Sequence, residues 1–206
     1  MKNMIKKILS LLFFLIPLNA YALIEVDITR GNLNPLPLAV SPLSIDEVSR
    51  SNFEKILKKE NIGSEISIIV ENNLRTSGLF NPLDKKAFLQ APDIANLKPR
   101  FEDWNLIKAQ ALITGKVSYV DEKLRVEFRL WDVLAAKEMM ALAFTTVPNN
   151  WRRVGHIISD KIYERLTGEK GYFDTRIIYV AEEGPKIQRI KKLAIMDQDG
   201  ANNKFL

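Results

Sequence analysis

The chain has 206 residues, enough for one domain and part of another. Hydrophobic residues make up 47% of it and charged residues 27%, which is an ordinary composition for a chain with an apolar core. The absence of cysteine excludes disulfides, thiol nucleophiles and cysteine-ligated metals. The formal charge is +5, and three of these positive charges lie within the first seven residues. The rest of the chain is therefore too evenly balanced to indicate a nucleic-acid-binding protein.

The N-terminus has the three parts of a secretory signal peptide. Lysines near the start are followed by an apolar run over residues 8–16 and by a small-x-small cleavage site at Ala20 and Ala22. The apolar run is shorter than the ~20 residues that span a bilayer, so a cleaved leader is favoured over a retained anchor. We expect a signal peptide over residues 1–22, export from the cytoplasm, and a mature chain that begins at Leu23.

A strand-like arm is predicted over residues 23–32. Apolar residues at every second position alternate with polar ones, and residues 31 and 32 then allow a turn. The alternating segment either forms the first strand of its own sheet or adds as a strand to a partner, and the pattern fits both. Its residues are Leu23, Ile24, Glu25, Val26, Asp27, Ile28 and Thr29. The prolines within residues 33–42 predict an edge strand or irregular structure next.

Helices and then strands follow. One helix is predicted over residues 45–60, capped by Ser44 with Glu47 as its capping-box partner. A second helix is predicted over residues 65–76, capped by Ser64 after an interruption at Gly63.

Residues 87–89 predict a short strand. Residues 101–108 predict a short helix whose Trp104 serves as a core anchor rather than as a binding platform. Strands over residues 111–120, 124–130 and 140–144, separated by turns, predict an antiparallel meander. Helices packed on one face of this mixed sheet make the class α+β.

A closing helix is predicted from Trp151. Asn149 or Asn150 would cap it, and Gly168 would end it as a left-handed stop. His156 and Asp160 fall on the polar side of the helix, four residues apart, where they could pair. Residues 176–180, beginning at Arg176, predict a new strand. One apolar stripe is formed by Trp151, Val154, Ile158, Ile162 and Leu166.

A set of residues runs through this helix and the connection after it: Gly155-His156, Ser159-Asp160, Glu164 to Gly168, Lys170-Gly171, Phe173 and Thr175-Arg176-Ile177. These residues resemble the domain junction of the TolB family. The resemblance implies that the helix closes an N-terminal α/β domain and that the strand opens a six-bladed β-propeller. The chain would then divide into a signal peptide (1–22), an arm (23–32), an α/β domain (33–172) and a partial first blade (173–206). His156, Asp160, Gly168 and Arg176 would lie at the domain junction. Ser77 to Leu83 give a second match to the family.

The end of the chain predicts a tight hairpin turn over residues 197–202. The turn is preferred over an EF-hand calcium loop, because counting back from Gly200 puts Ile195 at the first ligand position. An incomplete first blade cannot bury its own faces, so residues 173–206 should pack poorly. The chain would be either a fragment or a truncated gene product.

The sequence indicates no catalytic chemistry. One histidine without a nucleophile makes no triad, and it makes no zinc site with the partners visible in the sequence. We therefore expect no metal, no cofactor and no enzymatic activity.

The resemblance implies a periplasmic adaptor of the Tol–Pal system, peripheral to the membrane and monomeric. It would bind TolA through the arm, and Pal through propeller residues that lie outside this sequence. Two alternatives are a truncated product without Pal binding and a fragment of a secreted hydrolase gated by a propeller, although no Gly-x-Ser-x-Gly motif is present.

Overall fold

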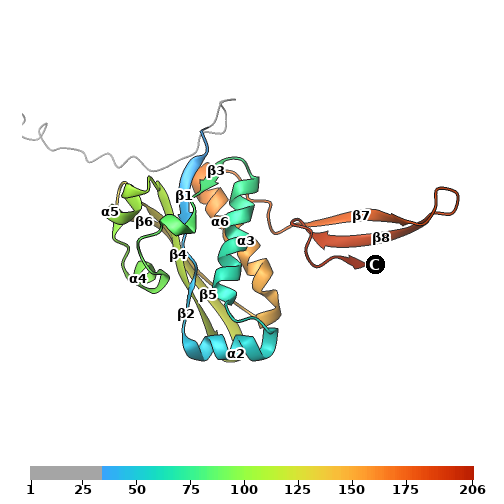
Figure 1. The fold of residues 1–206 in the computed structure, drawn as a ribbon, viewed down its shortest axis with the longest axis horizontal. Coiled ribbons are helices and arrows are strands. Elements are labelled where there is room, and N and C mark those ends of the chain that lie inside the picture. The colour runs from blue at the N-terminus through green and yellow to red at the C-terminus, as the bar shows by residue number, and fades with distance from the viewer. Residues whose placement is uncertain (1–33) are drawn as a thin grey trace, which may run out of the picture.

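The computed structural model describes residues 34–206. The predicted signal peptide, its cleavage site and the arm lie outside the described residues. A six-stranded mixed sheet forms the centre of the body, in the order β3-β1-β4-β5-β6 with β2 paired to β4, and a three-stranded antiparallel sheet follows it (Figure 1). The elements are β1 (Leu36–Val40), β2 (Ser44–Ile45), α2 (Glu47–Leu57), α3 (Ile62–Thr76), β3 (Phe80–Pro82), η1 (Lys85–Ala87), α4 (Pro92–Leu97), α5 (Phe101–Leu106), β4 (Ala111–Val120), β5 (Lys123–Asp132), β6 (Lys137–Thr146), η2 (Pro148–Asn150), α6 (Trp151–Thr167), β7 (Arg176–Glu183), β8 (Ile190–Asp197) and β9 (Lys204–Phe205).

The antiparallel meander of β4, β5 and β6 confirms the predicted strands. β4 and β5 pair along their whole length, from Ala111 opposite Asp132 to Val120 opposite Lys123. The turn between them places Asp121 and Glu122 at φ angles of 49° and 59°, as a two-residue hairpin turn requires. On β5 the even-numbered residues are buried and most of the others are half-buried, so the alternation in the sequence matches the two faces of the sheet.

The expectation of an edge or irregular segment near the prolines is wrong, because β1 is an interior strand. It pairs in parallel with β3 on one side and with β4 on the other. Pro37 is tolerated because it precedes Leu38, the first residue of β1 that is paired with β4. The Pro37 carbonyl accepts a hydrogen bond from the Gln110 N–H at 2.9 Å, and the missing Pro37 N–H would point beyond the start of β4.

The predicted caps of the first two helices are also wrong. α2 is capped by Asp46, whose Oδ1 accepts from the Ser49 N–H at 2.8 Å; this hydrogen bond is the main cause of the lowered pKa of Asp46. Ser44 lies in β2 instead. α3 is capped by Asn61 and includes Gly63 in its first turn, so there is no interruption before Ser64.

The predicted strand over residues 87–89 is absent from the described chain, because a 3-10 turn, η1, occupies residues 85–87. The side-chain acceptor that caps α2 lies two residues after the predicted one, and the acceptor that caps α3 lies three residues before the predicted one.

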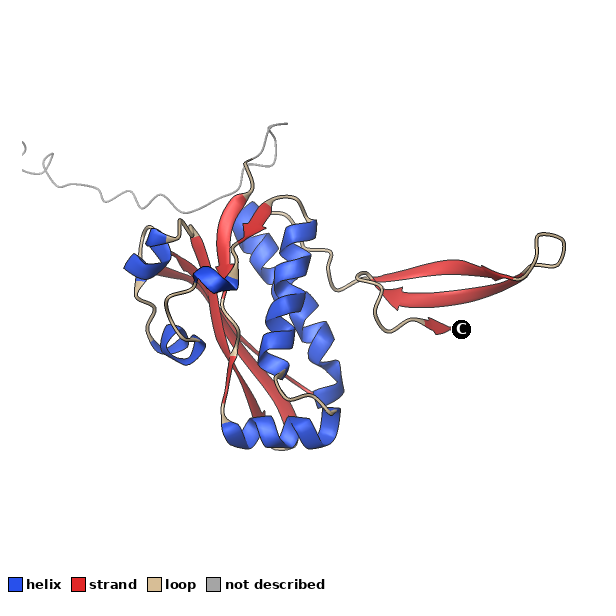
Figure 2. Ribbon diagram, viewed as in Figure 1, coloured by secondary structure: helices blue, strands red, loops and turns tan. Residues whose placement is uncertain are grey.

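Two apolar cores lie on opposite faces of the sheet. The larger core is between the sheet and the long helices α3 and α6, and it takes Leu38 and Val40 from β1 (Figure 2). The smaller core takes Ala39 from the opposite face of β1 and is centred on Trp104 of α5. The α+β class and the long helices on one face are as predicted, and the short helices α4 and α5 additionally cover part of the other face.

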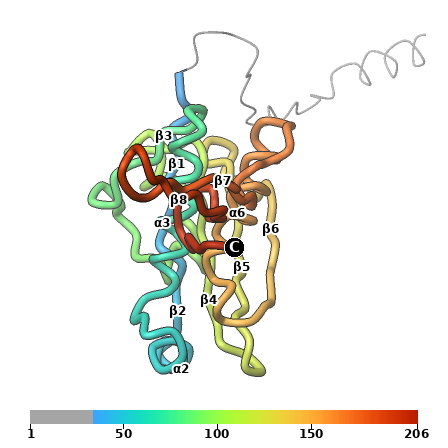
Figure 3. Tube along the Cα trace, turned by 90° about the vertical axis from the view of Figure 1, so that its right-hand side faces the viewer, coloured from blue at the N-terminus to red at the C-terminus, as the bar shows by residue number. Residues whose placement is uncertain are grey.

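The three-stranded sheet β7-β8-β9 projects from the side of the body (Figures 1 and 3). Ile178, Val180 and Leu193 on this sheet are 62%, 57% and 48% exposed, and Ala194 is buried. The sheet therefore leaves most of its apolar surface uncovered, which is consistent with a partial propeller blade. It contributes no residue to either buried core cluster among the described residues.

Candidate functional site at the joint between the body and the second sheet

The connection between α6 and β7 is anchored to the body by Asp160. α6 ends at Gly168, which has a φ of 76° as predicted for a left-handed stop. The chain then turns back, so that Asp160 Oδ1 accepts from the Phe173 N–H at 2.6 Å and Oδ2 from the Asp174 N–H at 3.1 Å. Gly171 makes this approach possible, because a Cβ at that position would lie 2.4 Å from the Cα of Asp160.

Two further contacts strengthen this linker anchor, which we define as Asp160, Arg153, Phe173 and Asp174. Phe173 is buried and packs edge-on against Tyr163 of α6, with ring centroids 5.8 Å apart. Arg153 donates to both carboxylate oxygens of Asp174 at 3.1 to 3.2 Å, and this hydrogen bond raises the pKa of Arg153. Phe173 thus belongs to the packed body, one residue beyond the expected boundary.

His156 is buried, which corrects the prediction that it lies on the polar face and pairs with Asp160. It is 2% exposed, and its Nδ1 accepts from the Asn73 side-chain amide at 2.9 Å. The same amide nitrogen donates to Ser159 Oγ at 2.9 Å. Asn73 is 2% exposed and comes from α3, so these hydrogen bonds join the two long helices through a polar network inside their interface.

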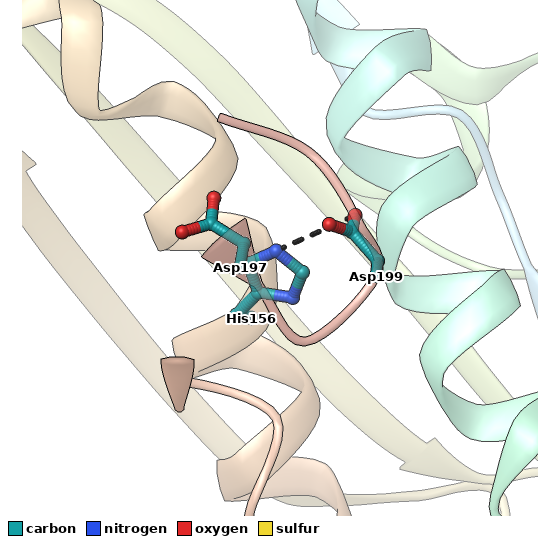
Figure 4. A group of neighbouring side chains, drawn as sticks. All are labelled: His156, Asp197 and Asp199. Atoms are coloured by element: carbon teal, nitrogen blue, oxygen red, sulfur yellow. Dashed lines mark ion pairs between the residues drawn. The ribbon is translucent and has the colours of Figure 1, made fainter. Parts of the chain in front are cut away.

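The turn between β8 and β9 reaches this network. Gln198 donates its side-chain amide to Asn73 Oδ1 at 2.8 Å, and Arg152 donates to Asp199. His156 Nε2 lies 3.6 Å from Asp199 Oδ2, and Figure 4 shows the ring and this carboxylate facing each other. We call Gln198 and Asp199, together with their body partners Asn73, Arg152 and His156, the turn contact.

The carboxylates in the cluster of His156, Asp197 and Asp199 are paired with cationic and amide side chains. One ligand atom from each residue lies within 4.8 Å of the others, which a metal would require. However, Asp199 is paired with Arg152, while Asp197 accepts from Asn202 and lies 3.8 Å from Arg176. The carboxylate charges are thus already balanced by arginines, and a divalent cation would add an uncompensated charge to a partly buried place.

The expected cap of α6 by an asparagine side chain is wrong. Asn150 occupies the cap position, but its amide donates to Thr146 Oγ1 at 3.0 Å and makes no capping bond. Arg176, expected at the junction, begins β7 and faces Asp197 across the sheet.

Asn73 was not predicted as a residue of the joint. Ser159 was predicted only as a match to the domain junction, and Gln198 and Asp199 only as part of the hairpin turn. One signal was available for Asn73: it follows Ile66, Ile69 and Val70 at helical spacing, so it continues the buried stripe of α3.

Burial lowers the pKa of His156 below its ordinary value of about 6.5. Desolvation is the largest cause, and Arg152 acts in the same direction, while Asp199, Asp197 and Asp174 oppose them. The neutral ring is therefore favoured in the folded protein. Because the ring binds fewer protons in the folded than in the unfolded chain, its contribution to stability is complete above about pH 6.5 and is lost as the pH falls through the lowered pKa.

We expect the free energy of unfolding to fall by up to about 1.4 kcal/mol per pH unit below pH 6.5 because of this one ring. Denaturant titrations at several values between pH 7.5 and 5 would measure the slope. The chain has one histidine, so the assignment is direct, and His156→Gln is the control that should flatten the profile. An equal slope in His156→Gln would contradict the assignment.

Within residues 34–206, no helix has the length and apolar content needed to cross a bilayer.

The fold and the joint define a two-part protein, in which an α+β domain is fixed by an anchored linker to a separate antiparallel sheet. Residues 24–139 match the model of the TolB amino-terminal domain. The Tol-Pal system protein TolB of Pelagibacter ubique (strain HTCC1062) is 82% identical over 203 residues, which cover 98% of this chain and 46% of that protein. The chain therefore belongs to the TolB family, and it spans about half the length of this curated relative.

A solved structure shows the same fold. The crystal structure of TolB from Acinetobacter baumannii superposes with a TM-score of 0.68 at 24% identity, covering 88% of this chain and 40% of that one. The family model and the 82% identity confirm, as family membership, the resemblance predicted from the junction residues.

Proposed function

We propose that this protein is a non-enzymatic periplasmic adaptor of the Tol–Pal system, which links inner-membrane Tol proteins to the outer membrane and peptidoglycan. In that role it would support outer-membrane integrity and invagination during cell division. The observation that carries the proposal is the 82% identity to a Tol-Pal system protein. The leader-like residues 1–22, with Ala20 and Ala22 as the cleavage site, support export to the periplasm.

The chemistry of the described residues supports a binding role over a catalytic one. The polar cluster of the joint is committed to holding two parts of the chain together: Asp160 accepts two backbone N–H groups, and Arg152 and Arg153 are each paired with an aspartate. His156 Nδ1 is occupied by Asn73. This arrangement positions no nucleophile beside a base.

We propose that residues 23–29 bind TolA by strand addition. Their alternation gives apolar side chains on one face, and an unpaired backbone would supply the hydrogen bonds that give affinity. Pal is proposed as a partner of the longer protein, through propeller residues that this sequence does not contain.

Val26→Pro is expected to weaken capture of the periplasmic domain of TolA by about tenfold or more, because proline removes a backbone donor and disrupts strand pairing. Val26→Ala is the matched control: it keeps the backbone and should retain most of the binding. Affinity would be measured by calorimetry. A deletion of residues 23–29 would provide the reference for complete loss of binding. Unchanged affinity in Val26→Pro would rule out strand addition through this segment.

A further inference from the structure

The second sheet is attached to the body in two places of unequal strength. The linker anchor combines a buried aromatic ring with two backbone hydrogen bonds to Asp160. Its ion pair between Arg153 and Asp174 adds little to this, because the Arg153 side chain is 62% exposed. The turn contact has only side-chain polar bonds, and the Arg152 and Asp199 side chains are 25% and 26% exposed. Partly exposed ion pairs contribute little to stability, so the turn contact is the weaker attachment.

The closed turn contact also leaves buried donors without acceptors. Arg152 Nε and His156 Nε2 are both buried and make no hydrogen bond. Because Asn73 donates to Nδ1 of the histidine, Nε2 carries the proton in the neutral ring. Buried donors without partners raise the free energy of the closed state, and water reaching them would lower the free energy of an open one.

A polar cavity of about 80 Å³ lies between the two attachments. Body residues such as Asn150, Arg153 and His156 line one side, and Arg176 and Asn202 line the other. A water molecule takes up about 30 Å³ of the liquid, so solvent can occupy this space beside the closed contact. Separation of the two surfaces therefore exposes polar groups to water, and among the described residues the sheet contributes none to either core cluster.

We infer that the turn contact is a releasable latch, and that the β7-β8-β9 sheet swings on the body about Thr175 between a latched and an unlatched position. Thr175 is exposed and follows Asp174, the last residue held by the linker anchor. The latch closes when Asp199 meets Arg152 and Gln198 meets Asn73, and it opens when these bonds exchange with water. Because it depends on charge, dissolved salt weakens it.

The latch is tested by the distance between the sheet and the body. The chain lacks cysteine, so Glu54→Cys on α2 and Lys186→Cys beyond β7, both at exposed positions, take spin labels specifically. Pulsed electron paramagnetic resonance then gives the distance distribution. Asp199→Asn should raise the unlatched population about fivefold, because it keeps the shape of the side chain but removes its charge. Raising salt to about 0.5 M should do the same to the parent protein and little to Asp199→Asn.

Glu182→Gln is the matched control. It removes one negative charge from the same sheet, where Glu182 pairs with Arg189 and Lys191, and leaves the body untouched. It should give the parent distribution, while Gln198→Ala should broaden the distribution as Asp199→Asn does. Identical distributions for the parent, Asp199→Asn and Gln198→Ala, or equal broadening by Glu182→Gln, would overturn the latch. Circular dichroism would verify that each variant is folded.

Discussion

Trp104→Ala is expected to lower the free energy of unfolding by about 3–5 kcal/mol, the range for removing a large aromatic side chain from a core. Trp104 is 1% exposed and is the largest side chain of the smaller core. Its indole N–H donates to Gln90 Oε1 at 2.7 Å, and its ring meets Phe88 edge-on at 5.0 Å. Alanine would leave a cavity beneath α5 and would remove the only hydrogen-bond donor that the ring provides.

Urea denaturation of the whole chain, followed by circular dichroism, would measure this loss. Leu106→Ala is the matched control, since Leu106 lies in the same helix, two residues on, and is 75% exposed. Its change should stay within about 0.5 kcal/mol. Equal effects of the two substitutions would mean that α5 does not depend on the tryptophan for its position on the sheet.

Trp104 also shows what could be predicted from the sequence. Its role as a core anchor was predicted, because a large aromatic residue in a short amphipathic helix is usually buried. The smaller core that contains this residue was not predicted. The smaller core exists because the chain from β3 to β4 crosses the face of the sheet opposite to α3 and α6. No local sequence pattern indicates which face of the sheet a connecting segment covers.

The meander could be predicted from local sequence patterns, whereas the joint could not. The strand over residues 124–130 and the turn before it depend on local sequence, and both were predicted correctly. The burial of His156 depends on Asn73, 83 positions earlier, and on the turn that holds Asp199. A helical wheel shows the apolar stripe of α6, but it cannot show that polar residues beside the stripe face a second helix and a sheet. The prediction of a surface pair with Asp160 was wrong for that reason.

The second large effect on stability is expected from a substitution in the polar network at the joint. Asn73→Leu is expected to lower the free energy of unfolding by about 2–3 kcal/mol, although leucine has a similar volume and is apolar. The substitution leaves His156 Nδ1 buried without a donor, and removes the acceptor of Gln198 and the donor to Ser159. Denaturant titration at pH 7.5 would measure it, where the histidine is neutral and no proton uptake can compensate.

Asn72→Leu is the closest control that the chain offers, because Asn72 precedes Asn73 on α3 and is exposed. Its side chain makes one exposed hydrogen bond, from Arg75 at 3.3 Å, so its loss should cost under about 0.5 kcal/mol. In the labelled protein, Asn73→Leu should also raise the unlatched population, because Asn73 belongs to both the helix interface and the turn contact. A variant that lost stability but kept the latched distance would separate these two roles and assign Asn73 to the body alone.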